Sequence, residues 1–496
     1  MRLARRVLTA ATWKINAKVI RTGVIFLRAV ILARLLPVEV FGVYAAATAI
    51  VALTAPFAQF GMGAAFLHRC KESRDELEAA SAHFTLKAIF TAFWMLVMIA
   101  SASFFSTGRM LTALLLLIGA TAVTGLTNTP KLILVRRVVH QRLASIEVIR
   151  SIVTTITAVA LAYQGATLWA LLSMDAVAAM VSVVALYLWR PVWRPVFSWN
   201  APVLRYFLKF GSRNFLAGLL SQALRRADIL WTQFYLGSTV LGFYSRSITF
   251  ARYPNQIVAQ PIQSIVGGAY AELKGNRKVL SQAFYRTNAL LVRAGFLLGG
   301  VLILVAPEFI RIVLGVKWMP MLDTFRLMLV FILLEPIRGT VQNLFIAVGA
   351  PEKLIMARLI QFGFLICGLY VLGTQFGIVG VAVTVNATLF LGLAILFTAS
   401  RRFVDCSVGR IFLTPILALV FGIAGARVAI TLPGILGSDW RTGGCKIIVF
   451  VLIYGGLMLL LESREVAKLI AFVRESRSLE SRRPRKGGVP DKATDT

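Results

Sequence analysis

Apolar residues in this chain come in blocks of about 20, and short polar turns separate one block from the next. A helix of about 20 residues can cross the roughly 30 Å hydrocarbon core of a bilayer. The stretches LLLLIGATAVTGL, from Leu114, and VFVLIYGGLMLLL, from Val449, lie in such blocks. The pattern predicts an all-α integral membrane protein with about fourteen transmembrane helices, near residues 15–36, 41–64, 82–105, 110–129, 143–163, 166–189, 207–235, 240–264, 287–306, 323–348, 354–373, 376–399, 410–431 and 445–461.

Lys and Arg gather in alternate loops between these spans, and the loops in between hold almost none, as at Gln164-Gly165 and Gly237-Ser238. Positive loops stay on the cytoplasmic side of a membrane. The pattern therefore predicts a multi-pass protein with an even number of spans and both termini in the cytoplasm. The tail from Glu462 is polar and basic, ends in RRPRKGGVPDKATDT, and is interpreted as disordered.

A short sequence recurs at an interval of 200 positions. Residues 41–44 read FGVY and residues 241–244 read LGFY, and each stretch begins an expected span. Pro56 and Pro254 follow at nearly the same depth in those two spans. Transporters built from parallel repeats show this kind of spacing. We therefore expect an N-terminal six-helix lobe (1–200), a C-terminal six-helix lobe (201–402), an extra helix pair (403–461) and a cytoplasmic tail (462–496).

Composition agrees with a membrane protein, since 58% of the 496 residues are hydrophobic and 15% are charged. The net charge of +32 is explained by basic loops on one side of the membrane, and no nucleic-acid partner is expected. The four Cys and three His are scattered, so neither a metal site nor a disulfide framework is predicted. There is no GxxxxGK[ST] motif for ATP, and no cofactor is expected.

Two arginines lie deep in expected spans with no acid within a turn of their own helix. Arg28 is near the middle of the first span, and Arg252 is two residues before Pro254. A charge at the bilayer centre costs about 2.5–3.5 kcal/mol on insertion scales, so it needs a wet or paired environment. Charges near span ends can reach the interface by snorkelling and are not assigned to a cavity here: Arg21, Arg34, Lys87, Arg150, Arg358 and Arg427.

Further charges in the spans allow two interpretations. The spacings of Arg225 with Asp228 and of Glu335 with Arg338 permit ion pairs within one helix. Alternatively, arginines including Arg226 line a water-filled central cavity that selects an anion, and the planar guanidinium suits phosphate in particular. Asp175, inside the sixth expected span, is a further intramembrane acid.

Several stretches resemble a known group. ILARLLPVEVFGVYAAATAI, FGMGAAFL, GATLWALL, LGFYSRSITFARYPNQIVAQPI, LGVKWMPMLDTFRLM and LFIAVGAPEK are similar to bacterial polysaccharide transporters, the oligosaccharide flippases of the multidrug/oligosaccharidyl-lipid/polysaccharide exporter superfamily. The resemblance runs from about residue 15 to about residue 400. It implies two six-helix lobes in a V plus an extra helix pair, in the bacterial inner membrane. It also implies a substrate, an oligosaccharide unit on undecaprenyl diphosphate, moved to the periplasmic leaflet for exopolysaccharide, O-antigen or capsule assembly beside other assembly proteins.

On this hypothesis Arg28, Arg252, Arg226 and Arg338 hold the diphosphate in the cavity. Alternating access is driven by an ion gradient, with Asp175, Asp228 and Glu335 as candidates for ion coupling. No catalytic residue is expected.

Three alternatives stay open. A lipid II flippase would share the cationic cavity and the number of spans. A multidrug/cation antiporter would need buried acids in the N-terminal half, whereas the first span offers only arginines. A membrane polysaccharide polymerase or ligase would need a large outer loop for its catalytic groups, and the longest outer loops expected are 307–322 and 432–444.

Overall fold

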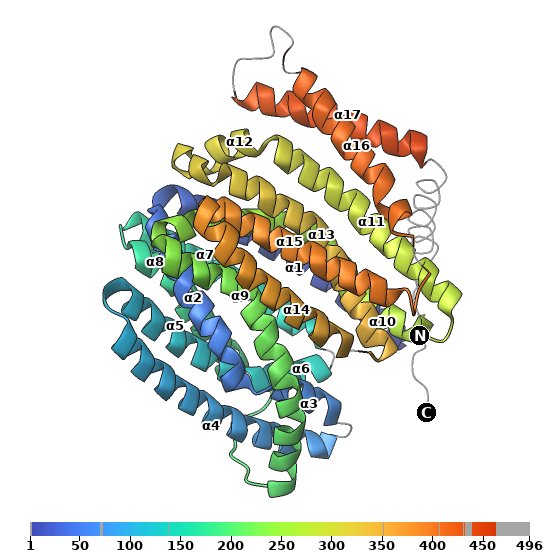
Figure 1. Ribbon diagram of the computed structural model, residues 1–496. Coiled ribbons are helices and arrows are strands. Elements are labelled where there is room, and N and C mark those ends of the chain that lie inside the picture. Colours follow the sequence, from blue (N-terminus) through green and yellow to red (C-terminus); the bar gives the residue numbers. More distant parts are fainter. Residues whose placement is uncertain are drawn as a thin grey trace, which may run out of the picture. The chain divides into compact units, whose positions relative to one another are not determined.

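The computed structural model describes residues 2–69, 73–137, 139–350, 352–405, 407–429, 431 and 439–462, and this part of the chain is helical, with no strand (Figure 1). Two compact units divide the chain, Met1–Cys406 and Ser407–Thr496. The first unit contains α1 (Arg2–Leu35), α2 (Val38–Gln59), α3 (Met62–Arg69), α4 (Ser73–Phe105), α5 (Gly108–Leu126), α6 (Asn128–Arg136), α7 (His140–Tyr163), α8 (Thr167–Val183), η1 (Val184–Leu188), α9 (Ala201–Ala251), η2 (Asn255–Ala259), α10 (Gln260–Leu273), α11 (Arg277–Leu304), α12 (Ala306–Phe309), η3 (Ile310–Leu314), η4 (Val316–Met321), α13 (Leu322–Val348), α14 (Glu352–Gly368), η5 (Leu369–Gly373) and α15 (Thr374–Ser400). The second contains α16 (Val408–Ala429) and α17 (Asp439–Leu461), which pack against each other. The predicted tail lies outside the described residues, except for Glu462.

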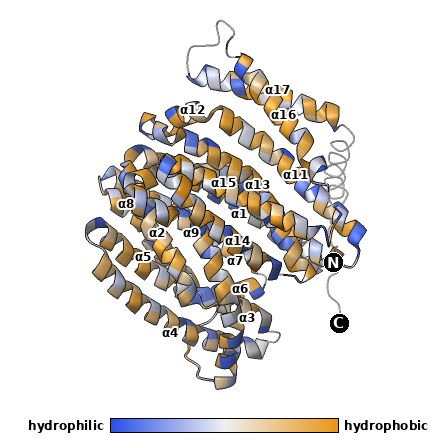
Figure 2. Ribbon diagram, in the orientation of Figure 1, coloured by the Kyte–Doolittle hydropathy of each residue, from blue (hydrophilic) through white to orange (hydrophobic). Residues whose placement is uncertain are grey.

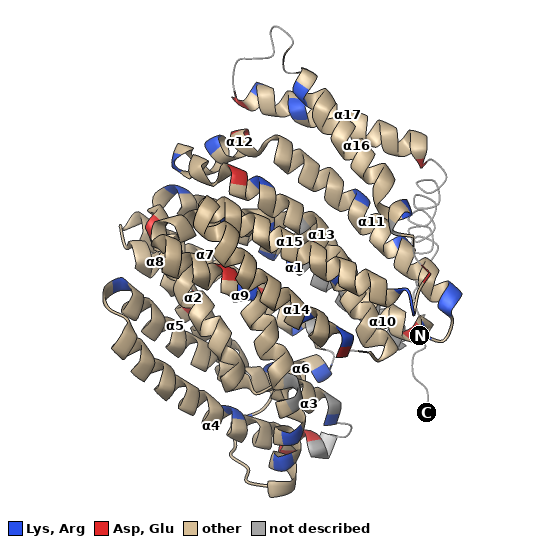
Figure 3. Ribbon diagram, viewed as in Figure 1, with Lys and Arg blue, Asp and Glu red and all other residues tan. Residues whose placement is uncertain are grey.

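Each expected span falls on a helical segment, which confirms the all-α membrane fold. Within the described residues, nine segments are long and apolar enough to cross a membrane, and one of them, Glu352–Ser400, has a break at Gly377. Apolar residues cover most of the helix lengths, while Lys and Arg stand mainly toward helix ends (Figures 2 and 3). The helices α1, α9 and α13 are not among the nine segments, and they carry most of the charged positions that the sequence singled out; Arg252 directly follows α9, and Asp175 lies in the segment Thr167–Leu188.

The helix α9 joins two expected spans without a loop. Its 51 residues are interrupted at Gly237, whose φ of 84° and ψ of 172° are not helical. Residues with a side chain rarely adopt a positive φ, so glycine permits this joint. We call residues 201–236 the first arm of α9 and residues 238–251 its second arm.

The FGVY and LGFY repeat marks the closest approach of the two halves. A methyl group on Gly42 would lie 1.7 Å from the main-chain oxygen of Ser238, and one on Gly242 would lie 2.3 Å from that of Val38. The contacts are reciprocal, because Val38 and Ser238 also differ by 200 positions. Small residues let membrane helices approach closely. The repeat therefore packs α2 against the second arm of α9.

A set of hydrogen bonds joins the C-terminal end of α1 to η3 and η4. Lys317 Nζ donates to the main-chain oxygens of Arg34 and Leu36, at 2.9 Å each, and Trp318 Nε1 donates to that of Ala33 at 2.9 Å. In return, Arg34 donates to the carbonyls of Val313 (2.9 Å) and Ile312. Partial burial lowers the pKa of Lys317 below its ordinary value. We call Arg34, Lys317 and Trp318, with these acceptors, the inter-lobe clasp.

Candidate functional site

The N-terminal half encloses a cavity of about 500 Å³ between α1, α2 and α4 to α8. Five basic side chains line it, together with two acidic ones and several hydroxyl groups. The basic residues are Arg21, Arg28, Lys87, Lys131 and Arg150, and the acids are Glu147 and Asp175. The lining thus has an excess of three positive charges, which suits an anionic ligand. We call this space the N-lobe cavity.

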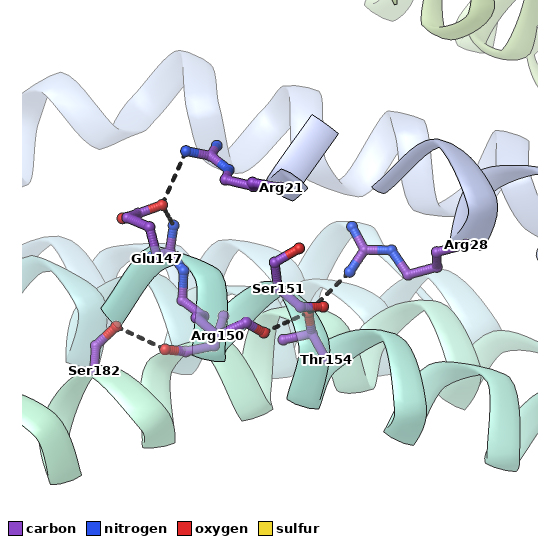
Figure 4. Close-up of polar contacts among 8 residues, drawn as sticks. Arg21, Arg28, Glu147, Arg150, Ser151, Thr154 and Ser182 are labelled. Carbon is purple, nitrogen blue, oxygen red and sulfur yellow. Dashed lines mark hydrogen bonds and ion pairs between the residues drawn. The ribbon is translucent and has the colours of Figure 1, made fainter. Parts of the chain in front are cut away.

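Arg28 points from α1 toward α7 in this cavity (Figure 4). Its Nη1 donates to Thr154 Oγ1 at 2.9 Å, and the Thr154 hydroxyl donates to the carbonyl of Arg150 at 2.8 Å. Within the described part of the chain no carboxylate lies within ion-pair distance of Arg28. Its guanidinium therefore keeps donors that a bound anion can use.

Lys87 and Lys131 are also without a hydrogen bond or ion pair to any other described residue. Lys87, in α4, is only 2% exposed, and Lys131 comes from α6. Arg21 and Arg150 differ, because both contact Glu147, with nitrogen–oxygen distances of 3.0 and 2.6 Å. The sequence analysis left Arg21, Lys87 and Arg150 out of the cavity as charges that can snorkel, and the structure shows that all three line the N-lobe cavity.

Asp175, in α8, also lines the cavity, interacts electrostatically with Arg28, and accepts a hydrogen bond from the Tyr44 hydroxyl at 2.7 Å. From the C-terminal half, Arg246 in α9 reaches toward this region, with its guanidinium carbon 4.5 Å from the centre of the Phe41 ring. Arg246 interacts electrostatically with Tyr44 and Arg28. Sequence reasoning missed Arg246, although an arginine in the apolar stretch LGFYSRSITF was a signal that could have found it.

A second, smaller pocket of about 80 Å³ lies in the C-terminal half between α9, α13, α14 and α15. Five of the residues singled out in the sequence line it: Arg225, Asp228, Arg252, Glu335 and Arg338. Arg28 and Asp175 line the N-lobe cavity instead, so in this structure the charged residues of the two halves line separate spaces. The physical reason is the glycine contact: α2 is a wall of the first space, the second arm of α9 is a wall of the second, and these helices pack closely.

Of the two ion pairs that the spacing along the sequence allowed in the second pocket, only one is formed. Arg338 contacts Glu335 at 3.1 Å, and Asn255 donates to the same carboxylate at 2.6 Å. Asp228 does not pair with Arg225. It accepts from the Tyr244 hydroxyl at 2.6 Å.

Arg225 and Arg226 are adjacent in α9 but have different surroundings. Arg225 lines the second pocket and donates to Gln222 at 3.3 Å. Arg226 lines neither space, and its buried Nε has no hydrogen-bond partner among the described residues.

The two tyrosines of the repeat have the same role with different partners. Tyr44 and Tyr244 differ by 200 positions and each donates to an aspartate, but Asp175 belongs to α8 and Asp228 to α9. The counterpart of Asp228 at this interval is Arg28. The halves therefore share a scaffold and invert the charge at this position.

Comparison with known proteins first defines the class of fold. The lipid II flippase MurJ in an inward closed conformation aligns with a TM-score of 0.74 at 13% identity, over 92% of this chain and 100% of that one. An inward-facing multidrug resistance MATE family transporter of the MOP superfamily aligns with a TM-score of 0.58 at 17% identity, over 79% and 98%. The fold is thus that of multi-pass membrane transporters.

The family follows from the sequence. The profile of the family described as "Polysaccharide biosynthesis protein" matches residues 31–323, and the chain belongs to that family, which confirms the resemblance. The succinoglycan biosynthesis transport protein ExoT of Rhizobium meliloti (strain 1021) is 26% identical over 294 residues, which cover 56% of this chain. The match spans 57% of that relative's length.

Proposed function

We propose that this protein is a flippase that moves an undecaprenyl-diphosphate-linked oligosaccharide across the bacterial inner membrane for polysaccharide assembly. The observation that carries the proposal is the N-lobe cavity, in which Arg28, Lys87 and Lys131 have no carboxylate partner among the described residues. A diphosphate offers several charged oxygens, and cations in a partly desolvated site bind such groups strongly. The family match and the succinoglycan transport relative support a glycan as cargo.

In the proposed cycle the sugar and diphosphate enter the N-lobe cavity while the polyprenyl chain stays in lipid. Rocking of one lobe against the other then exposes the cavity to the other side. Arg252 and Arg338 line the second pocket, in the C-terminal half, so in this conformation they do not face the same diphosphate as Arg28. We keep the predicted lobes, the extra helix pair and the cytoplasmic termini as part of the proposal.

An ion gradient is the proposed energy source. Asp175 lines the proposed substrate cavity, so protonation there would change the charge that the substrate meets. Asp228 keeps one buried carboxylate oxygen without a partner among the described residues, which leaves it able to take up a proton or a cation. Glu335 already contacts Arg338 and Asn255 and is the weaker of the three candidates.

The test measures polysaccharide export by an Arg28→Ala variant, expressed in a strain that lacks the chromosomal copy of the gene for this protein. Loss of a charge-assisted hydrogen bond to the substrate is worth about 1.5–3 kcal/mol, so export should fall by about tenfold or more. The control is Arg326→Ala, because Arg326 pairs with Asp323 at 3.7 Å and lines neither pocket. Normal export by Arg28→Ala, at equal protein in the membrane, would contradict the proposal.

Lipid II is the second candidate substrate, because the MurJ fold covers nearly the whole chain. Mass spectrometry of the lipid-linked glycan that accumulates in the deletion strain separates the two. An oligosaccharide repeat on the diphosphate lipid is the expected result, and accumulation of lipid II would favour the alternative.

A further inference from the structure

One carboxylate in the N-lobe cavity holds two of its arginines. Glu147, on α7, lies one turn before Arg150, and Arg21 faces it from α1 (Figure 4). The same oxygen, Glu147 Oε2, lies 3.0 Å from Arg21 Nη1 and 2.6 Å from Arg150 Nη2. The two guanidinium groups therefore converge on a single acceptor, as they would on one oxygen of a phosphate.

The basic residues of the cavity thus form two groups. No carboxylate among the described residues lies within ion-pair distance of Arg28, Lys87 or Lys131, although Asp175 acts electrostatically on Arg28 and Glu147 on Lys131. Arg21 and Arg150, in contrast, are in direct contact with Glu147. The side chains of Arg21, Glu147 and Arg150 are 43%, 31% and 23% exposed, so all three are partly open to water. Ion pairs with this degree of exposure are weak, so another anion can replace the carboxylate. A phosphate group is a good replacement, because it presents several oxygens to the planar fork of each arginine.

We propose, resting on the proposed function, that Glu147 is a specificity-determining residue whose carboxylate takes the place of a substrate phosphate while the cavity is empty. The entering diphosphate displaces Glu147 from Arg21 and Arg150, and it also contacts Arg28 and the two lysines. An anion with a single charge can satisfy the first group but gains little from displacing a carboxylate of equal charge. Glu147 therefore favours headgroups with several negative charges.

The test uses the purified full-length protein, titrated with inorganic pyrophosphate by isothermal calorimetry. Glu147→Gln removes the competing charge and leaves a side chain of nearly the same shape. We expect its Kd for pyrophosphate to be about three- to tenfold lower than that of the wild type, the gain expected from releasing two partly exposed ion pairs. In the double variant Arg21→Gln/Glu147→Gln one released arginine is missing, and the Kd should return toward the wild-type value.

The matched control is Asp405→Asn. Asp405 pairs with Arg277 at 2.6 Å, both side chains are more than half exposed, and neither lines the cavity. This variant changes the net charge as Glu147→Gln does, so its Kd should stay within about twofold of the wild type. An equal gain in the control would show a general charge effect and overturn the inference.

Two further outcomes separate this inference from the proposed function. Binding by the wild type, with unchanged or weaker binding by Glu147→Gln, would overturn the role of Glu147 and leave the diphosphate cavity standing. Absence of pyrophosphate binding by the wild type and every variant would overturn both.

Discussion

Lys87 is an amine in a place where little stabilises a positive charge. Its side chain is 2% exposed, and no described residue forms a hydrogen bond or ion pair with it. A buried charge without a partner costs several kcal/mol of stability even after the surroundings relax. Polar groups of this kind inside a membrane protein are a sign of function, because nothing in the folding energetics favours them. The N-lobe cavity supplies the function here, as Lys87 lines it.

Replacing Lys87 with Met should therefore separate stability from activity. The apolar side chain fills a similar volume without the desolvation cost, so the melting temperature of the purified protein should rise by several degrees. Export should fall by about tenfold or more, since one cation of the substrate site is lost. Lys353→Met, at an exposed position, should change neither quantity. A variant that melts earlier and still exports normally would show that Lys87 has a structural role only.

Single residues also show where sequence reasoning reached its limit. The depth of a charge was judged from the expected end of its span, and for Lys87 that end was residue 82. The helix α4 in fact begins at Ser73, so Lys87 lies fourteen residues inside it. Hydropathy marks the apolar part of a helix and misses polar turns that extend it. The same holds for Arg21, because its span was expected to begin near residue 15 and α1 begins at Arg2.

At the scale of elements, α2 and the second arm of α9 form the contact that organises the first unit. The repeat was visible in the sequence, and so was its place at the start of two spans. The sequence did not show that each glycine of the repeat packs against the helix that carries the other, because spacing along a chain does not specify which helix surfaces are in contact. The same contact places Arg28 and Arg252 in separate pockets.

A Gly42→Ala substitution tests this contact. The added methyl group would lie 1.7 Å from a main-chain oxygen, so α2 and α9 must move apart. Overpacking of this kind costs about 1–3 kcal/mol, and the melting temperature should fall by a few degrees. Gly119→Ala is the control, because nothing lies within 4 Å of the added atom. Equal melting temperatures for Gly42→Ala and the wild type would contradict the close packing of these helices.

At the scale of the whole molecule, the membrane fold and the positions of the spans could be predicted, because an apolar block of fixed length is a local property. The two halves of the first unit share one buried cluster, in which Phe41 and Leu117 of the first half join Tyr244 and Phe325 of the second. Such contacts between distant segments, like the inter-lobe clasp, leave no pattern in a single sequence. The clasp joins the first helix of one half to the connection between α11 and α13 of the other.

In the orientation that the loops predict, the clasp closes the outer side of the protein. Lys317→Ala removes two of its hydrogen bonds, and each is worth about 1 kcal/mol. The outward-open population should then rise about fivefold or more.

The measurement uses a cysteine introduced at Met174, which lines the N-lobe cavity, in a background without other cysteines. A membrane-impermeant maleimide is added from outside, and the rate at which it labels this cysteine is recorded. Arg109→Ala, which breaks a 3.8 Å surface pair with Glu39, should leave the rate unchanged. Slower labelling of Lys317→Ala would contradict a closing role.

The acceptors of the clasp are main-chain oxygens, and every residue of the chain has one. Substitutions at Ala33, Leu36, Ile312 or Val313 therefore leave the acceptors in place, whereas a change at Arg34, Lys317 or Trp318 removes a donor outright. In evolutionary terms, the acceptor positions tolerate sequence drift and the three donor positions do not. The ease of opening can thus be adjusted between related proteins through three codons, without any matching change at the acceptor positions.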